Sequence, residues 1–260
     1  MCKMDSSFEG TNHIRQVIVQ VCTVRTGTEG HAVVRIIDHL HHTVDIFFHH
    51  FNVPVFKKLI HDSNGNYTKY ILMPTNLTDI VDSIKTLPVN DVIILDQTNP
   101  NLKSYPAIYQ NHEKDIFECL LKGKVRLEKY KKLILIFPGF REPLGMKVGF
   151  ENFCTQYNFY HEIITEFIDQ EIAIGDLYVI PNDRDLVGVI QQARNRNLKL
   201  GLDFGIISYN ETPLKKVVEK GITTISTDFE AMGKILAAMV IKGNNVQIEN
   251  KSSLIMRQSL

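Results

Sequence analysis

The chain has 260 residues, a length that suits two lobes of about 130 residues each, because domains cluster near 100 to 150 residues. Hydrophobic residues make up 44% and charged residues 22%, which excludes general disorder and a collagen-like chain. The 29 basic residues balance the 29 acidic ones, whereas a segment whose main task is to hold nucleic acid would carry a basic surplus. The composition therefore argues against this chain as the part of a protein that holds DNA.

The cysteines and the apolar stretches indicate a reduced, non-membrane location. The four cysteines form no C-x-x-C pair: Cys2, Cys22, Cys119 and Cys154. The polar start, Met1 to Arg15, lacks the apolar region of a secretory signal. The most apolar stretches, 133–137 and 235–241, fall short of the roughly 18 to 20 residues that cross a bilayer. We therefore expect a cytoplasmic protein without a membrane partner.

Short β-branched runs alternate with amphipathic helical patterns along almost the whole chain. In the first half, the expected strands are 16–22, 44–48, 70–73, 91–95 and 107–109, and the expected helices are 31–40, 55–61 and 77–86. In the second half, the expected strands are 133–137, 161–165, 177–180, 206–209 and 223–226, and the expected helices are 113–122, 146–157, 183–195 and 228–241. This alternation predicts an α/β protein with parallel sheets covered by helices on both faces.

The helix ends and the tail complete the predicted layout. Asp183 and Asp228 are candidate N-caps, and Gly243 fits a helix end. The tail carries a β-like stretch, 253–256, that we expect to add to an existing sheet.

The two halves have similar layouts and join near residues 105–112, which predicts two Rossmann-like lobes with a central crevice. We expect an N-terminal tail at 1–15, a first lobe from 16–109 plus 230–245, and a second lobe from 110–229 plus 246–260. Open α/β folds bind small ligands at the carboxyl ends of their strands, so the crevice is the expected binding place.

Four stretches of the second half resemble, in order and spacing, the effector-binding region of LacI/GalR-type repressors. They are Pro181-Asn182-Asp183 with Leu186-Val187-Gly188, the run 205–211, the run 222–229 followed by Gly233, and the run 254–259. In the first half, 91–96 and 145–150 fall where that family places a strand ending in Asp and an R-x-x-G motif. The run 44–52 resembles a narrower subset, known especially from Bacteroides, that joins a GntR-type winged helix to this body.

The resemblance implies the periplasmic-binding-protein type I fold, a small carbohydrate effector such as a deoxyhexose like fucose, no cofactor and no catalysis. It also implies a homodimer that reaches DNA through an attached domain, since residues 1–15 cannot form a DNA-reading module of roughly 60 to 80 residues. The resemblance implies that Asp96, Asn182, Asp183, Asn210 and Thr227 face the ligand, and Tyr109 and Arg141 are our further candidates for ligand binding. Capping or turn formation is the alternative role for Asn182, Asp183 and Asn210.

The sequence departs from the family pattern at several of these places. Met146 stands where the family has an arginine, and Arg141 is the candidate substitute. Asn210 and Glu211 replace a pair of acids, and Thr227 replaces a glutamine. No Trp is present, so Phe140 or Tyr109 would have to stack under a sugar ring.

The same chain allows other interpretations. It lacks the G-x-S-x-G, P-loop, G-x-G-x-x-G and H-E-x-x-H motifs, so a carbohydrate-processing enzyme has no motif in its favour. A sugar-binding protein of a transport system would need an exported location. We interpret the histidines between 39 and 50 as surface or loop residues, with a zinc site as the alternative. We interpret the basic run 122–132 as a solvated surface, with a nucleic-acid patch as the alternative.

Overall fold

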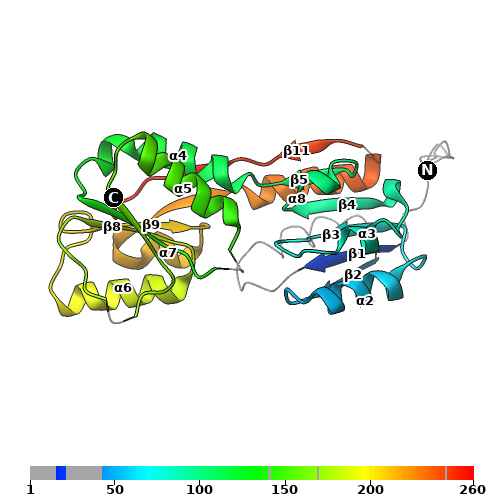
Figure 1. Cartoon of the computed structure of the whole chain (residues 1–260), viewed down its shortest axis with the longest axis horizontal. Helices are drawn as coiled ribbons and strands as arrows, with labels where there is room; N and C mark the ends of the chain where they lie inside the picture. Colours follow the sequence, from blue (N-terminus) through cyan, green and yellow to red (C-terminus); the bar gives the residue numbers. More distant parts are fainter. Residues whose placement is uncertain (1–15, 22–42, 140–141, 169, 244) are drawn as a thin grey trace, which may run out of the picture.

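The computed structural model describes residues 16–21, 43–139, 142–168, 170–243 and 245–260. This part of the chain forms two lobes, each built on a six-stranded sheet (Figure 1). The expected tail at 1–15 and the expected helix 31–40 lie outside the described residues. Within the described part, none of the helices has the length and apolar character that crossing a bilayer requires.

The sheet of the first lobe is parallel throughout, in the order β11-β5-β4-β3-β1-β2. Its strands are β1 (Gln16–Val21), β2 (Thr43–Phe48), β3 (Lys69–Leu72), β4 (Val92–Asp96), β5 (Ala107–Tyr109) and β11 (Gln247–Glu249). Helices α2 (Val53–Ser63) and α3 (Val81–Ile84) pack against one face, and α8 (Phe229–Lys242) packs against the other. A parallel strand buried on both faces needs an apolar run, and β4 is such a run, with Val92 to Leu95 all buried.

The sheet of the second lobe has the order β12-β10-β9-β8-β6-β7, and only β12 is antiparallel to its neighbour. Its strands are β6 (Lys132–Ile136), β7 (His161–Ile164), β8 (Asp176–Ile180), β9 (Gly205–Tyr209), β10 (Thr223–Thr227) and β12 (Ser252–Ile255). Helices α4 (His112–Leu127) and α5 (Leu144–Gln156) cover one face, α6 (Asp183–Asn195) covers the other, and the short α7 (Pro213–Val217) follows β9.

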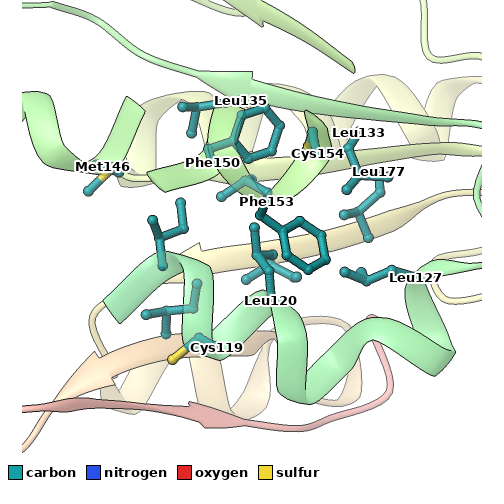
Figure 2. Close-up of a cluster of buried hydrophobic side chains, with 14 of the residues drawn as sticks. Cys119, Leu120, Leu127, Leu133, Leu135, Met146, Phe150, Phe153, Cys154 and Leu177 are labelled. Carbon is teal, nitrogen blue, oxygen red and sulfur yellow. The ribbon is translucent and has the colours of Figure 1, made fainter. Parts of the chain in front are cut away.

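Helices α4 and α5 enclose the larger core of the second lobe (Figure 2). Phe150 and Phe153 of α5 are fully buried against Leu120 of α4 and Leu135 of β6. The two helices approach closely at Gly149, where an added Cβ would lie 2.1 Å from the carbonyl oxygen of Glu113. The glycine of the sequence motif at 145–150 therefore has a packing role.

The helix ends confirm two of three predictions from the sequence. The Asp228 side chain caps α8 by accepting from the Ala231 amide at 2.8 Å, and Gly243 ends that helix with φ of 67°. The prediction of Asp183 as an N-cap is wrong. Asn182 caps α6, because its side-chain oxygen accepts from the Asp185 amide at 2.9 Å, and Asp183 is already inside the first turn.

Three other expectations differ from the structure. The helix expected over 77–86 forms only as Val81–Ile84, because Asp79 has a left-handed φ of 59° that interrupts it. The helix α7 is not among the expected elements. The expected second lobe includes the whole tail from residue 246 onward, but Gln247–Glu249 pairs with β5 of the first sheet, and the chain enters the second sheet only at Ser252.

Candidate functional site

The carboxyl ends of the parallel strands of each lobe face the other lobe. The chain passes between the lobes three times, from β5 to α4, from β10 to α8 and from β11 to β12. Strand β5 ends at Tyr109 and α4 of the second lobe starts at His112; strand β10 ends at Thr227 and α8 of the first lobe starts at Phe229. All other parallel strands share the direction of these two, so the loops at both carboxyl edges meet between the lobes.

On the side of the first lobe, Asp96 and Tyr109 lie at this edge as the last residues of β4 and β5. Both side chains are half-buried. Asp96 has a φ of 73°, a region that non-glycine residues enter rarely and mostly as Asp or Asn. Thr75 follows β3 with a φ of 52°, although it is β-branched. Such backbone strain persists only where surrounding contacts hold it, and it concentrates at ligand sites.

On the side of the second lobe, Asn182, Asp183 and Asn210 follow β8 and β9. The Asn182 side chain is engaged with Asp185, accepting from its amide and donating to its carboxylate at 2.6 Å. Asn210 has a φ of 59° and is half-buried. Its position matches that of Asp96 in the first lobe, because each residue has a left-handed backbone conformation and lies at the carboxyl end of a strand.

A buried lysine holds this second edge together. Lys215 of α7 donates from Nζ to the carbonyl oxygens of Tyr209 at 2.6 Å and Asn210 at 3.2 Å, and forms an ion pair with Asp183 at 3.0 Å. The lysine side chain is only 4% exposed, and its three donors match these three oxygens. Lys215 therefore fixes the loop that carries Asn210 relative to the start of α6.

The neighbouring Glu211 is part of a separate, charged support. The Arg257 guanidinium donates to both carboxylate oxygens of Glu211, at 2.7 and 2.9 Å, and also to the carbonyl oxygen of Ile222. Burial raises the pKa of Glu211, but hydrogen bonds from Arg257 and Thr224 outweigh burial and lower that pKa below its usual value. Both side chains of the pair are less than one-fifth exposed, so the pair ties the C-terminal segment to the loop after β9.

A chain of hydrogen bonds connects the three crossings. Gln110 donates to the Asp96 carboxylate and accepts from the Thr227 hydroxyl. Because the Thr227 hydroxyl donates to Gln110, the Ser252 hydroxyl is the donor in its 2.7 Å hydrogen bond with Thr227, and the Ser252 amide donates to Asp115 at 3.0 Å. Burial raises the pKa of Asp115, although hydrogen bonding from Ser252 opposes that effect. Each of the three crossings thus contributes one residue to this chain of hydrogen bonds: Gln110 after β5, Thr227 at the end of β10 and Ser252 at the start of β12.

The structure brings six of the seven sequence-predicted site residues to the edge between the lobes, and the seventh, Arg141, lies outside the described residues. Met146, where the family has an arginine, is buried among the apolar residues of the second lobe (Figure 2). Sequence reasoning missed Gln110, Ser252 and Lys215. The first two lie at crossings between lobes, and their only sequence signal is a polar residue close to the end of a strand.

The alternative sites find less support in the described part of the chain. No three His, Cys, Asp or Glu side chains group there as metal ligands, and Nε2 of His49 is hydrogen-bonded to the carbonyl oxygen of Met73 at 3.1 Å. A cavity of about 480 Å³ lies beside α2, next to Phe47 and Tyr67. Two of its polar side chains are paired with neighbours, Tyr67 by a hydrogen bond to Asp45 and Asp62 by an ion pair with Lys58.

Comparisons with known proteins agree on the fold. Residues 129–260 match the model of the periplasmic binding protein-like domain. A search of curated proteins gives no match. Among solved structures, the dimeric Lac repressor is 15% identical with a TM-score of 0.77, and the match covers 94% of this chain and 98% of that chain.

Two further structures show the same fold. The trehalose repressor from Escherichia coli is 11% identical with a TM-score of 0.75, covering 93% of this chain and 100% of its own. A LacI family regulator from Lactobacillus casei with bound glucose is 16% identical with a TM-score of 0.74, covering 94% and 99%. Because the matched domain spans half of the chain, the chain belongs to the periplasmic binding protein-like family, and it has the type I fold of the effector-binding domains of LacI-type repressors.

Proposed function

We propose that this chain is the effector-sensing part of a bacterial transcription regulator and that it binds a small sugar between its lobes without making or breaking a bond. The observation that carries the proposal is the pair of facing carboxyl edges, with Asp96 on one and Asn210 on the other. Carboxylate and carboxamide groups suit sugar hydroxyls, which both donate and accept. The glucose bound to the Lactobacillus casei regulator supports a sugar as the ligand class.

The proposed ligand contacts are Asp96, Tyr109, Asp183 and Asn210, with Arg141 as a further candidate. Asn182 and Thr227 then serve mainly to hold the site, because the first caps α6 and the second joins the hydrogen bonds of the crossings. A sugar that contacts both edges favours one relative orientation of the lobes. It shifts that equilibrium only by its difference in affinity for the two orientations.

The remaining parts of the proposal follow from the same comparison. The protein acts in the cytoplasm as a homodimer, and a change in lobe orientation alters the spacing of DNA-binding domains attached to the two copies. The Lac repressor, which shares the fold, is a dimer in one solved structure, and in another that dimer is bound to its operator. A deoxyhexose such as fucose is the narrower ligand proposal.

Thermal-shift measurements against pentoses, hexoses, deoxyhexoses such as fucose, and their phosphates test this function. A compound that binds the native state at 100 times its Kd stabilises it by about 2.7 kcal/mol. We expect at least one sugar to raise the melting temperature, and a complete absence of shifts would contradict the proposal.

A matched pair of variants tests the site. Asn210→Ala should abolish most of the sugar-dependent shift, whereas Asn158→Ala should leave it unchanged. Asn158 has nearly the same backbone φ, 58°, but lies between α5 and β7, at the opposite end of the strands. Both replacements strain the backbone equally, so a difference between them reports the contact with the sugar. Equal shifts in the two variants would show that the site is assigned wrongly.

A further inference from the structure

Buried polar atoms without a hydrogen-bond partner concentrate at the edge between the lobes. In the described part of the chain, six buried side-chain atoms lack a partner: His49 Nδ1, Thr75 Oγ1, Thr98 Oγ1, His112 Nε2, Tyr130 OH and Tyr209 OH. Only Tyr130 lies before a strand. The other five lie at or just after the carboxyl ends of β2, β3, β4, β5 and β9. Folded proteins pair more than nine-tenths of their buried polar groups, so this concentration needs an explanation.

Three of these atoms follow neighbouring strands of the first lobe. Thr75, Thr98 and His112 follow β3, β4 and β5, which are adjacent in the sheet. The Asn76 side chain, next to Thr75, donates across the lobes to the carbonyl oxygen of Glu142 at 2.9 Å.

His112 lies between the same elements. Asp96 of the first lobe and Asp115 and Glu142 of the second lobe all act electrostatically on its imidazole. Burial raises the pKa of Tyr209, and Cys119, Asp115 and Glu142 add to that effect, so its hydroxyl lies near α4 and Glu142 in the second lobe. His112 and Tyr209 thus share Asp115 and Glu142 as charged neighbours.

The charges around His112 and Tyr209 disfavour an anion. Burial lowers the pKa of His112 and so favours the neutral ring, although the three carboxylates oppose that effect. Lys215 uses its donors on Tyr209, Asn210 and Asp183. A phosphate group at this place would therefore meet the carboxylates of Asp96, Asp115 and Glu142. A hydroxyl group, by contrast, both donates and accepts, so it matches threonine, tyrosine and either tautomer of a neutral imidazole.

We propose that Thr75, Thr98 and His112, with Tyr209 opposite them, bind the hydroxyl groups of an uncharged polyol and that the surrounding carboxylates exclude its phosphorylated form. This inference rests on the sugar-binding function proposed above and specifies the class of sugar. The residues named are specificity-determining residues, distinct from the contacts proposed there.

Matched sugars and phosphates test the exclusion of anions. The probes are D-glucose, D-xylulose and L-fucose, each compared with its own phosphate: D-glucose 6-phosphate, D-xylulose 5-phosphate and L-fucose 1-phosphate. We expect the sugar that binds to do so at least tenfold more tightly than its phosphate by isothermal titration calorimetry. A phosphate that binds as tightly as its parent sugar overturns the inference but leaves the sugar-binding function standing. If none of the six compounds binds, the proposed function itself is contradicted.

Isosteric variants test the unpartnered atoms with and without sugar. Thr98→Val, His112→Phe and Tyr209→Phe each remove one such atom, so the melting temperature of the ligand-free protein should stay the same or rise. The control is Thr223→Val, because the buried Thr223 hydroxyl accepts from the Arg257 amide at 2.9 Å and donates to the Arg257 carbonyl at 3.3 Å, so its loss should lower the melting temperature.

With sugar present, each of the three test variants should weaken binding about tenfold, the effect of one lost hydrogen bond. Melting temperatures that fall as far as in Thr223→Val would show that these atoms have partners within the protein, and would overturn the inference even if no probe binds. Unchanged sugar affinity in all three variants would overturn it equally.

Discussion

The close approach of α4 and α5 makes Gly149→Ala a quantitative test of the packing that positions the start of α4. An added methyl carbon would lie 2.1 Å from the Glu113 carbonyl oxygen and 2.6 Å from Cγ2 of Ile116. Carbon atoms in ordinary contact stay about 3.5 Å or more apart, so the helices must separate by about 1 Å. Overpacking of this kind costs about 1–3 kcal/mol or more, while alanine in a helix regains about 0.5–1 kcal/mol over glycine.

The expected net loss is about 1–2 kcal/mol, which lowers the melting temperature by roughly 2–8 °C in a chain of this size. Gly188→Ala in α6 is the matched control, because its added carbon meets only Cδ1 of Phe167 at 3.4 Å and the Phe167 carbonyl oxygen at 3.8 Å. That variant should gain about 0.5–1 kcal/mol. Thermal unfolding followed by circular dichroism measures both. If Gly149→Ala melts at or above the parent temperature, the two helices do not approach as described.

Three further variants probe the supports of the second edge and the buried histidine of the first lobe. Lys215→Met leaves Asp183 and two carbonyl oxygens without their donor, so the free energy of unfolding should fall by about 2–3 kcal/mol in urea titrations; an unchanged midpoint would contradict the assigned role. Glu211→Gln removes the charge opposite Arg257 and should cost about 1–3 kcal/mol at pH 7. Since the pKa of Glu211 is lowered in the folded state, this deficit should shrink as the pH falls below about 4.5 towards the folded pKa, and a deficit independent of pH would argue against the ion pair. Burial lowers the pKa of His49 in the folded protein, so as the pH drops below 6.5 the unfolded chain takes up a proton before the folded chain does. The free energy of unfolding should therefore decrease as the pH is lowered, by up to about 1.4 kcal/mol per pH unit. His49→Gln should reduce this pH dependence when melting temperatures are compared at pH 7.5 and 5.5.

The alternation of strands and helices was predictable because each element has a local signal. The buried strand β4 is an uninterrupted apolar run, and α6 begins and ends where its periodicity predicted. The short α3 shows the limit of such a signal, because the left-handed Asp79 is a backbone feature that hydrophobic periodicity does not report.

The contents of the site were less predictable because its contacts join distant parts of the chain. The Asp96 to Gln110 bond and the Gln110 to Thr227 bond depend on how three crossings meet, which no local pattern encodes. The role of Asn182 was also ambiguous, since capping and ligand contact require the same residue type at the same place. The buried Met146 could be recognised only as a departure from a family pattern, not as a core residue of α5.

The kind of bond at the crossings bears on how a ligand could move the lobes. Gln110, Thr227 and Ser252 connect the crossings through uncharged donors, each bond worth about 0.5–1.5 kcal/mol net, whereas each lobe is held by its own large apolar core. Reorienting the lobes therefore costs a few such bonds, together with the Lys114–Glu249 ion pair and the Asn76 to Glu142 bond, and unfolding either lobe costs far more. A ligand with micromolar affinity has about 8 kcal/mol in total, and shifting the lobes from 1:99 to 99:1 requires a difference of about 5.5 kcal/mol between orientations. A sugar could supply that difference only if most of its contacts form in one orientation, which is the arrangement expected when Asp96 and Asn210 contact it from opposite lobes.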